Sequence, residues 1–288
     1  MKLASGLRSF LLYALFVVLS IEENSARKIN TGYDQDGHDL ERNLRKHDHG
    51  HPLSHMGHMM DPALQVFFMP NELKAGKTMP IYFPKTNLSS SPKLLTKEES
   101  DSIPFSISQL PFLLDFFSFS ENSPQAKAIE YTLKQCELKP IEGETRFCAT
   151  TLESMLDFAL YVFGSSTRFK VLTTTRLINS STLLQNYTIL ENPKEIFATR
   201  MIGCHTMPYP YAVFYCHSQE SENKVFEVSL VGENGERVDA AAVCHMDTSR
   251  WDRDHVSFRV LRVEPGTSPV CHFFPSDNLV WVPFSASV

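Results

Sequence analysis

One dipeptide, Cys-His, occurs four times in the last third of the chain, and its spacing constrains the fold more than any other feature. The pairs are Cys204-His205, Cys216-His217, Cys244-His245 and Cys271-His272. They are separated by 10, 26 and 25 residues, and Trp281 follows the last pair after eight more. Thiol and imidazole groups both bind metals, and thiols also form disulfides. The repeated dipeptide therefore predicts a metal site, a set of disulfides, or both.

The first residues have the composition of a secretory signal peptide. Lys2 and Arg8 accompany an apolar run of 11 residues, 10–20, which is shorter than the roughly 20 residues that span a bilayer. Small residues at Ser20 and Ala26 suit cleavage, so we assign 1–26 to the signal peptide. The alternative is an uncleaved anchor or a buried helix.

Secretion changes what is expected of the cysteines and of three asparagines. An even number of cysteines in a secreted chain predicts disulfides, so Cys136 and Cys148 join the four cysteines of the repeated pairs as expected bridge residues. Six cysteines allow 15 pairings, and the sequence does not choose among them. Asn87, Asn179 and Asn186 each begin an Asn-x-Ser/Thr sequon and are candidate glycosylation sites.

Residues 27–63 are predicted to be a polar tail. They lack hydrophobic periodicity and are rich in histidine and methionine. Imidazole and thioether groups together suit copper. A copper-gathering tail is one hypothesis, and a solvated linker of biased composition is the other. The tail's residues in question are His38, His47, His49, His51, His55, His58, Met56, Met59 and Met60.

The remainder, 64–288, is predicted to be one α+β domain, a helical layer followed by a mainly antiparallel β region braced by disulfides. Capping signals predict helices that begin after Thr96, after Ser123 and after Thr150, the last with Glu153 as its capping partner. From 168 onward, β-branched and aromatic runs predict strands, including 257–263, SFRVLRV. Asn234-Gly235 predicts a hairpin turn, and the Phe-rich stretch 111–120 predicts core packing.

Three interpretations of the repeated pairs remain open from the residues alone. They are two Cys2His2 zinc sites, disulfides with hydrogen-bonded histidines, and disulfides with histidine-bound copper. Adjacent residues of a strand point to opposite faces, so we expect the four sulfurs on one side and the four imidazoles on the other. Trp281 is expected in the core or over the metal layer, and His255 as a surface residue or a fifth ligand. Asp247 and Thr248 are candidates either to orient an imidazole or to cap a turn.

The spacing of the pairs and of Trp281 resembles that of the plant BURP-domain family. The segments 66–84 (VFFMPNELKAGKTMPIYFP), 204–217 (CHTMPYPYAVFYCH), 243–251 (VCHMDTSRW) and 269–282 (PVCHFFPSDNLVWV) are also similar to that family. The resemblance covers about 66–284, and the compact layout is similar to the seed and embryo subgroup. It implies copper on His205, His217, His245 and His272, all of which are present.

Two functions follow from the resemblance. Some members are copper-dependent cyclases that oxidatively join a Tyr or Trp side chain to another position of a short peptide; others are non-catalytic proteins of the cell wall, seed development or stress response. Residues 27–63 contain Tyr33 but no Trp and no repeat, so we expect a cyclase that acts in trans on a separate precursor peptide. The alternative is a non-catalytic protein with a cell-wall partner. The expected location is the apoplast, another extracellular site or a storage vacuole, with no membrane attachment after cleavage. A net charge of −6 argues against nucleic acid.

Overall fold

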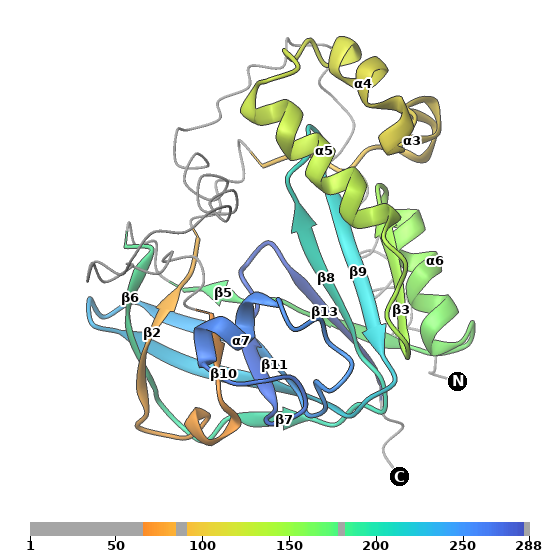
Figure 1. Ribbon diagram of the computed structural model, residues 1–288. Coiled ribbons are helices and arrows are strands. Elements are labelled where there is room, and N and C mark those ends of the chain that lie inside the picture. The colour runs from red at the N-terminus through yellow and green to blue at the C-terminus, as the bar shows by residue number, and fades with distance from the viewer. Residues whose placement is uncertain (1–65, 85–90, 178–181, 285–288) are drawn as a thin grey trace, which may run out of the picture. The chain divides into compact units, whose positions relative to one another are not determined.

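The computed structural model describes residues 66–84, 91–177 and 182–284. The predicted signal peptide, the His/Met-rich tail and the sequons at Asn87 and Asn179 lie outside these residues. The described chain is α+β, as predicted, with two antiparallel sheets and short helices (Figure 1). No helix of the described residues is long and apolar enough to cross a membrane.

The larger sheet has eight strands in the order β1-β12-β11-β10-β6-β2, with β5 beside β11 and β7 beside β10. Its long central hairpin turns at Asn234-Gly235, as predicted, because Gly235 supplies the positive φ of 80° that the turn requires. The strands are β1 (Phe67–Phe68), β2 (Thr78–Tyr82), β5 (Thr175–Arg176), β6 (Leu184–Ile189), β7 (Lys194–Ile196), β10 (Asn223–Gly232), β11 (Arg237–His245) and β12 (Val270–Phe273).

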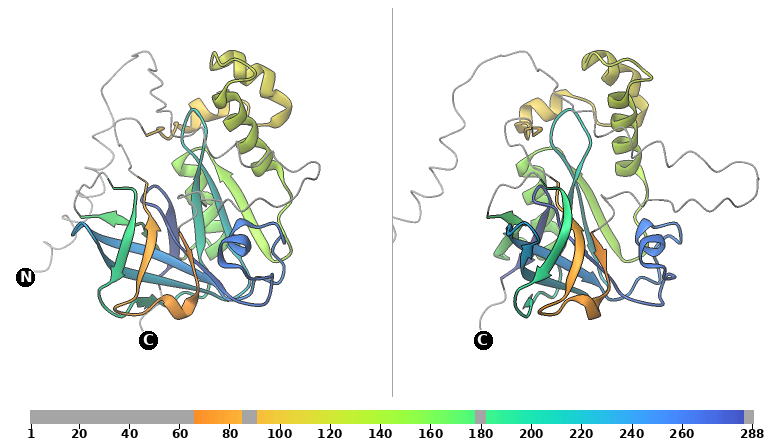
Figure 2. Two further views of the ribbon diagram at one scale, coloured as in Figure 1. Left: turned by 60° about the vertical axis from the view of Figure 1, so that its left-hand side comes forward. Right: turned by 90° about the vertical axis from the view of Figure 1, so that its left-hand side faces the viewer.

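The smaller sheet has five strands in the order β3-β9-β8-β13-β4. These are β3 (Glu144–Ala149), β4 (Phe169–Leu172), β8 (Ile202–Met207), β9 (Val213–Gln219) and β13 (Leu279–Pro283). One apolar cluster contains residues of both sheets, with Val243 of β11, Val225 of β10 and Val280 of β13 all buried. The two sheets therefore share a core, and Figure 2 shows them from two further sides.

The helices are α3 (Lys97–Ser102), α4 (Leu110–Phe116), α5 (Pro124–Glu137), α6 (Leu152–Phe163) and α7 (Val256–Leu261), with two 3-10 turns, η3 (Pro70–Glu72) and η4 (Ile107–Gln109). Helices α3 to α6 lie on the side of the smaller sheet, whereas α7 contacts β1 of the larger sheet. Apolar side chains of α6 pack against β8, β9 and β13, whereas α4 and α5 pack around Tyr209 and Tyr211 beside the β8–β9 turn. Figure 1 shows α6 alongside β3.

The capping predictions are largely confirmed. Thr96 and Glu99 form the capping box of α3, and Ser123 caps α5 with Pro124 at its first position. The predicted cap of α6 was wrong by one residue: Thr151, not Thr150, accepts the N–H of Ser154, and Thr150 instead bonds the hydroxyl of Ser100. The Phe-rich stretch is only partly core, since Leu113 and Leu114 are buried but Phe112 and Phe116 are about half exposed.

The strand predicted at SFRVLRV is also wrong, because residues 256–261 form the helix α7. His255 accepts a hydrogen bond from the backbone N–H of Ser257 and so caps the helix. Arg262, with a left-handed φ of 57°, ends it. Burial of Phe258 against neighbouring elements outweighs the β propensity of the two valines.

Candidate metal centre

The four Cys-His pairs occupy four strands, two in each sheet. Cys204 lies directly opposite Cys216 in the β8–β9 register, and Cys244 lies opposite Cys271 in the β11–β12 register. Each of these partners forms a disulfide with a Cα–Cα distance of 3.9 Å. A third disulfide joins Cys136 at the end of α5 to Cys148 of β3. All six cysteines are thus bridged, as predicted.

The alternation of sulfur and imidazole is confirmed within each sheet, but the single layer of sulfurs is wrong. The Cys204–Cys216 bridge is buried with α6 and Trp281, whereas the Cys244–Cys271 bridge is buried in a different core with Phe68 and Phe273. The reason is that the pairs lie on two sheets. Each sheet turns its sulfurs into its own core.

The four imidazoles meet and form a row. The ring centroids of His217 and His205 are 5.4 Å apart, those of His205 and His272 are 5.9 Å apart, and those of His272 and His245 are 5.5 Å apart. The row therefore crosses from the smaller sheet to the larger one. At each end, two Nε2 atoms face one another at 3.4 Å, His217 to His205 and His245 to His272.

Burial keeps three of these rings, those of His205, His245 and His272, neutral. It lowers the pKa of His205 and of His245 well below the ordinary value, with neighbouring histidines adding to the effect, and it lowers the pKa of His272 to about 3. A neutral imidazole has one nitrogen with a free lone pair, which is the form that binds metal. The site therefore favours the ligand form of these histidines at neutral pH.

Asn223, the first residue of β10, decides which nitrogen of His245 is free. Its amide NH2 donates to the backbone carbonyls of Gln219 and Ser221, at 3.4 and 2.6 Å. Its oxygen therefore faces His245 Nδ1, at 2.7 Å, and accepts a hydrogen bond from it. With Nδ1 protonated and the ring neutral, the lone pair of His245 lies on Nε2, the nitrogen that faces His272.

Glu144 lies beside His217 at the other end of the row, without an aligned hydrogen bond to the Nδ1 atom of that ring. Its Oε1 lies 3.4 Å from His217 Nδ1 and accepts a hydrogen bond from the hydroxyl of Tyr215. Burial acts to raise the pKa of Glu144, but His217, the N–H of Ile141 and the guanidinium of Arg146 outweigh it and hold that pKa below its usual value. The ionised carboxylate lies beside a ring whose Nε2 faces His205.

The space beside the His217–His205 pair is kept open by a glycine. Gly203 lies opposite His217 on β8. A Cβ placed on it would lie 3.5 Å from both Nε2 atoms and 3.1 Å from the ring of Phe274. That ring stacks on His205 and on His272, with centroid distances of 4.9 and 4.7 Å. The histidines thus have an aromatic wall, and the absent side chain of Gly203 leaves a narrow space beside two of them.

The donor set fits a bound metal. Bonds of about 2.0–2.1 Å at a tetrahedral angle of about 109° separate two ligand nitrogens by about 3.3 Å, close to the observed 3.4 Å. The donors come as two pairs: within residues 66–84, 91–177 and 182–284, no three His, Cys, Asp or Glu side chains already surround one point. The Cys2His2 zinc interpretation is wrong for this structure, because bridged sulfurs are not thiolates.

Of the remaining residues singled out in the sequence, one lies beside the histidines and three have structural roles elsewhere. His255 lies next to it, with its ring 4.7 Å from that of Trp251, which is in turn 4.9 Å from His245. Trp281 is a core residue on the sulfur side of β13, 4% exposed. Asp247 accepts the N–H of Ser249, and Thr248 bonds the backbone at Ser268 and Gly266, so both brace turns rather than histidines.

Sequence reasoning missed Asn223, Glu144, Phe274 and Gly203. Only Gly203 and Phe274 adjoin a Cys-His pair in the sequence, at one residue before Cys204 and two after His272. Asn223 and Glu144 reach the histidines through strand pairing, for which the sequence holds no local signal. Of the sequons, Asn186 is described and is exposed on β6, where its amide donates to Glu233.

Comparison with known proteins identifies the class of this fold and site. The BURP domain model matches residues 66–283, and the chain belongs to the BURP domain family. Among its relatives, BURP domain protein USPL1 of Arabidopsis thaliana is 47% identical over 279 residues, which cover 95% of this chain and 96% of the relative. BURP domain-containing protein BNM2A of Brassica napus is 47% identical over 282 residues, covering 96% and 95%. BURP domain protein RD22 of Arabidopsis thaliana is 36% identical over 223 residues, covering 77% and 56%.

Proposed function

We propose that this chain is a secreted copper-binding BURP protein that cyclises a separate precursor peptide by oxidatively joining a Tyr or Trp side chain to a second position. The observation that supports copper is the row of four imidazoles, with Nε2 atoms facing in pairs at 3.4 Å, of which burial keeps His205, His245 and His272 neutral. His205, His217, His245 and His272 would hold the metal. Imidazole-rich sites favour Cu(II), which heads the divalent affinity series.

The proposed reaction removes two electrons and two protons from the peptide. One C–H of the aromatic ring, or its O–H or N–H, and one X–H at the second position are lost, one bond forms, and dioxygen accepts the electrons and protons. Copper, when bound, supplies the one-electron steps that connect the peptide to dioxygen. The chain's own residues do the rest: Asn223 holds the tautomer of His245, Glu144 lies against the ring of His217, and Phe274 and Trp251 form apolar walls.

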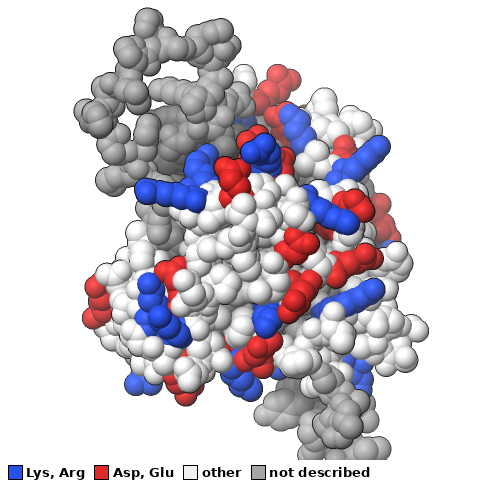
Figure 3. Space-filling view, turned by 60° about the horizontal axis from the view of Figure 1, so that its bottom comes forward, with Lys and Arg blue, Asp and Glu red and all other residues white. Residues whose placement is uncertain are grey.

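A peptide is a better partner class for this surface than a nucleic acid. On the face drawn in Figure 3, Lys and Arg side chains are interspersed with Asp and Glu, whereas a phosphate-binding face concentrates basic side chains. The substrate is proposed to be a separate chain because residues 27–63 hold a single Tyr, Tyr33, and no Trp. We place the reaction in the secretory pathway, with the apoplast or a storage vacuole as its end point.

The test combines copper loading with mass spectrometry. Full-length protein is reconstituted with Cu(II), its metal content is measured, and it is incubated in air with secreted Tyr- or Trp-containing precursor peptides. The expected product has lost the mass of two hydrogens per crosslink. His272→Gln abolishes the product, whereas His58→Gln, in the tail, leaves it unchanged. Absence of bound copper after reconstitution, or unchanged peptide masses with fully loaded protein, would refute the proposal.

The second candidate function is a non-catalytic protein of the cell wall or the storage vacuole, acting in seed development or stress response. The exposed aromatic side chains of α4, Phe112 and Phe116, are a specific observation in its favour, since they offer an apolar contact surface away from the histidines. This protein would bind a wall component equally well with and without copper. Retention on isolated wall material that is unchanged in His272→Gln distinguishes it from the cyclase.

A further inference from the structure

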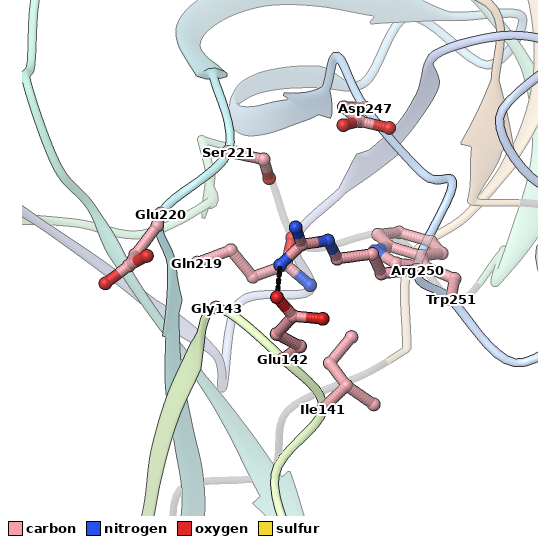
Figure 4. A pocket seen from close by; sticks show the side chains of 9 residues that line it. All are labelled: Ile141, Glu142, Gly143, Gln219, Glu220, Ser221, Asp247, Arg250 and Trp251. Atoms are coloured by element: carbon pink, nitrogen blue, oxygen red, sulfur yellow. Dashed lines mark ion pairs between the residues drawn. The ribbon is translucent and has the colours of Figure 1, made fainter.

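A pocket of about 230 Å3 is lined in part by Trp251, whose ring packs against His245. Three segments form it: 141–143 before β3, 219–221 between β9 and β10, and 247–251 after β11 (Figure 4). Of the adjoining strands, β3 carries Glu144, β9 carries His217 and β11 carries His245. The pocket is therefore built at the strand ends nearest the candidate metal centre.

Trp251 separates the pocket from the histidines. Its indole lines the pocket, and its ring centroid lies 4.9 Å from that of His245. The volume is below the roughly 300–1,000 Å3 of ordinary small-molecule sites. Such a space takes one side chain rather than a whole peptide. The ring centroids of Trp251 and His245 are 4.9 Å apart, and an extended residue covers about 3.3–3.6 Å, so a few residues of extended peptide reach from the pocket past Trp251 to His245.

More acidic than basic side chains line the pocket. Glu142, Glu220 and Asp247 line it together with a single cation, Arg250. Arg250 NH1 pairs with Glu142 at 2.9 Å, but both side chains are more than half exposed, so this pair is weak and replaceable. Figure 4 shows the ion pair of Arg250 with Glu142, and Glu220 on the side of the pocket opposite Trp251.

Gln219 gives a second and independent indication. Its Oε1 is shielded from solvent and accepts no hydrogen bond within the described residues. A buried acceptor without a donor is costly, so a ligand N–H that reaches it gains more than an exposed contact would. A group with several N–H donors and a positive charge satisfies both the amide oxygen and the carboxylates.

We propose that this pocket binds a Lys or Arg side chain of the peptide substrate, within a few residues of the aromatic residue that meets the histidines. The substrate class follows: a precursor peptide with a basic residue close to its Tyr or Trp. The identity of the ligand as a substrate rests on the proposed cyclase function. Binding itself needs no copper.

The test measures binding to copper-free, full-length protein. Short labelled peptides carry one Trp and, three residues away, Arg, uncharged citrulline or Glu, each with a free or an acetylated N-terminus. Fluorescence anisotropy at low and high salt gives the affinities. The Arg peptide is expected to bind about tenfold tighter than the citrulline peptide, irrespective of acetylation, and salt is expected to reduce the difference.

Variants with opposite expected effects exclude a change in folding as the cause. Glu220→Gln combined with Asp247→Asn weakens the Arg peptide about tenfold without affecting the citrulline peptide, and Asn at 247 can still cap its turn. Arg250→Gln removes the resident cation and strengthens the Arg peptide. Glu153→Gln, exposed on α6, is the matched control and changes nothing. Circular dichroism confirms folding of each variant.

Equal binding of the Arg, citrulline and Glu peptides overturns the proposal, as does the absence of binding at millimolar concentration. A preference that follows the free N-terminus instead of the side chain also overturns it. The outcome is separable from the cyclase proposal. Arg-selective binding without any crosslinking keeps the pocket and removes the cyclase, and crosslinking without a basic-residue preference does the reverse.

Discussion

Gly203→Ala adds one methyl group beside His205 and His217, in a space slightly too small for it. Gly203 has no positive φ, so alanine can take its backbone conformation. The new Cβ lies 3.5 Å from the Nε2 atoms of His205 and His217 and 3.1 Å from Phe274 Cζ. The Phe274 ring has to move by a few tenths of an ångström, and the ring stacks on two histidines.

The expected effects on stability and on copper binding differ in size. Crowding in a packed core costs about 1–3 kcal/mol, and replacing a strand glycine offsets about 0.5–1 kcal/mol of it. A net loss of about 0–2 kcal/mol leaves the protein folded, given a typical stability of 5–15 kcal/mol. Copper affinity is expected to fall at least about 10–100-fold, the range seen when the surroundings of metal ligands are disturbed.

The assay pairs urea unfolding of the copper-free protein with a chelator-competition titration of Cu(II), followed by electron paramagnetic resonance. Ala240→Val is the matched control, because Ala240 is a buried residue of β11 in the larger sheet, five residues before His245. It is expected to lower stability without changing copper affinity. A folded Gly203→Ala protein with unchanged copper affinity and spectrum would show that this space is not part of the metal site.

Three further predictions follow from particular contacts. Asn223→Leu removes the acceptor at His245 Nδ1 and is expected to lower copper affinity about 10–100-fold, measured by the same titration. Asn192→Leu, on a surface loop, is the control. Equal copper affinities of the two variants would contradict the role of Asn223. Copper-free protein is expected to lose stability as pH falls below about 6.5, because unfolded histidines then take up protons that buried, pKa-lowered His205, His245 and His272 do not. For His272 the loss of stability continues toward pH 3. Urea midpoints from pH 7 to 5 measure the loss, and His272→Gln is expected to make the midpoint less dependent on pH. A midpoint that does not change with pH would be inconsistent with neutral buried rings. Replacing Cys244 and Cys271 together by alanine opens a bridge of sequence separation 27 and is expected to lower the free energy of unfolding by about 3–4 kcal/mol. Opening the Cys136–Cys148 bridge, of separation 12, is expected to lower it by about 3 kcal/mol. A decrease under about 1 kcal/mol in urea unfolding would count against the entropic estimate.

Local signals in the sequence predicted local structure well. The capping residues Thr96 and Ser123 begin their helices, and Asn234-Gly235 makes its hairpin, because each acts through contacts within a few residues. The predictions that failed concern segments whose structure depends on contacts beyond their own residues. SFRVLRV has strand-forming residues, but the capping by His255 and the burial of Phe258 come from the surrounding structure and make it a helix.

The sequence by itself determined which groups the site contains: four imidazoles, each next to a cysteine, in a chain with an even number of cysteines. It also determined that sulfur and imidazole diverge, because neighbouring residues of a strand point to opposite faces. Only the tertiary structure decided that the Cys-His pairs divide between two sheets. As a result the two disulfides lie in two separate cores, whereas the imidazoles of the two sheets meet, His205 against His272. The tertiary structure alone decided that Asn223 and Glu144 lie beside the outer rings, because strand register, which depends on packing of the whole sheet, brings together residues that are distant in the chain.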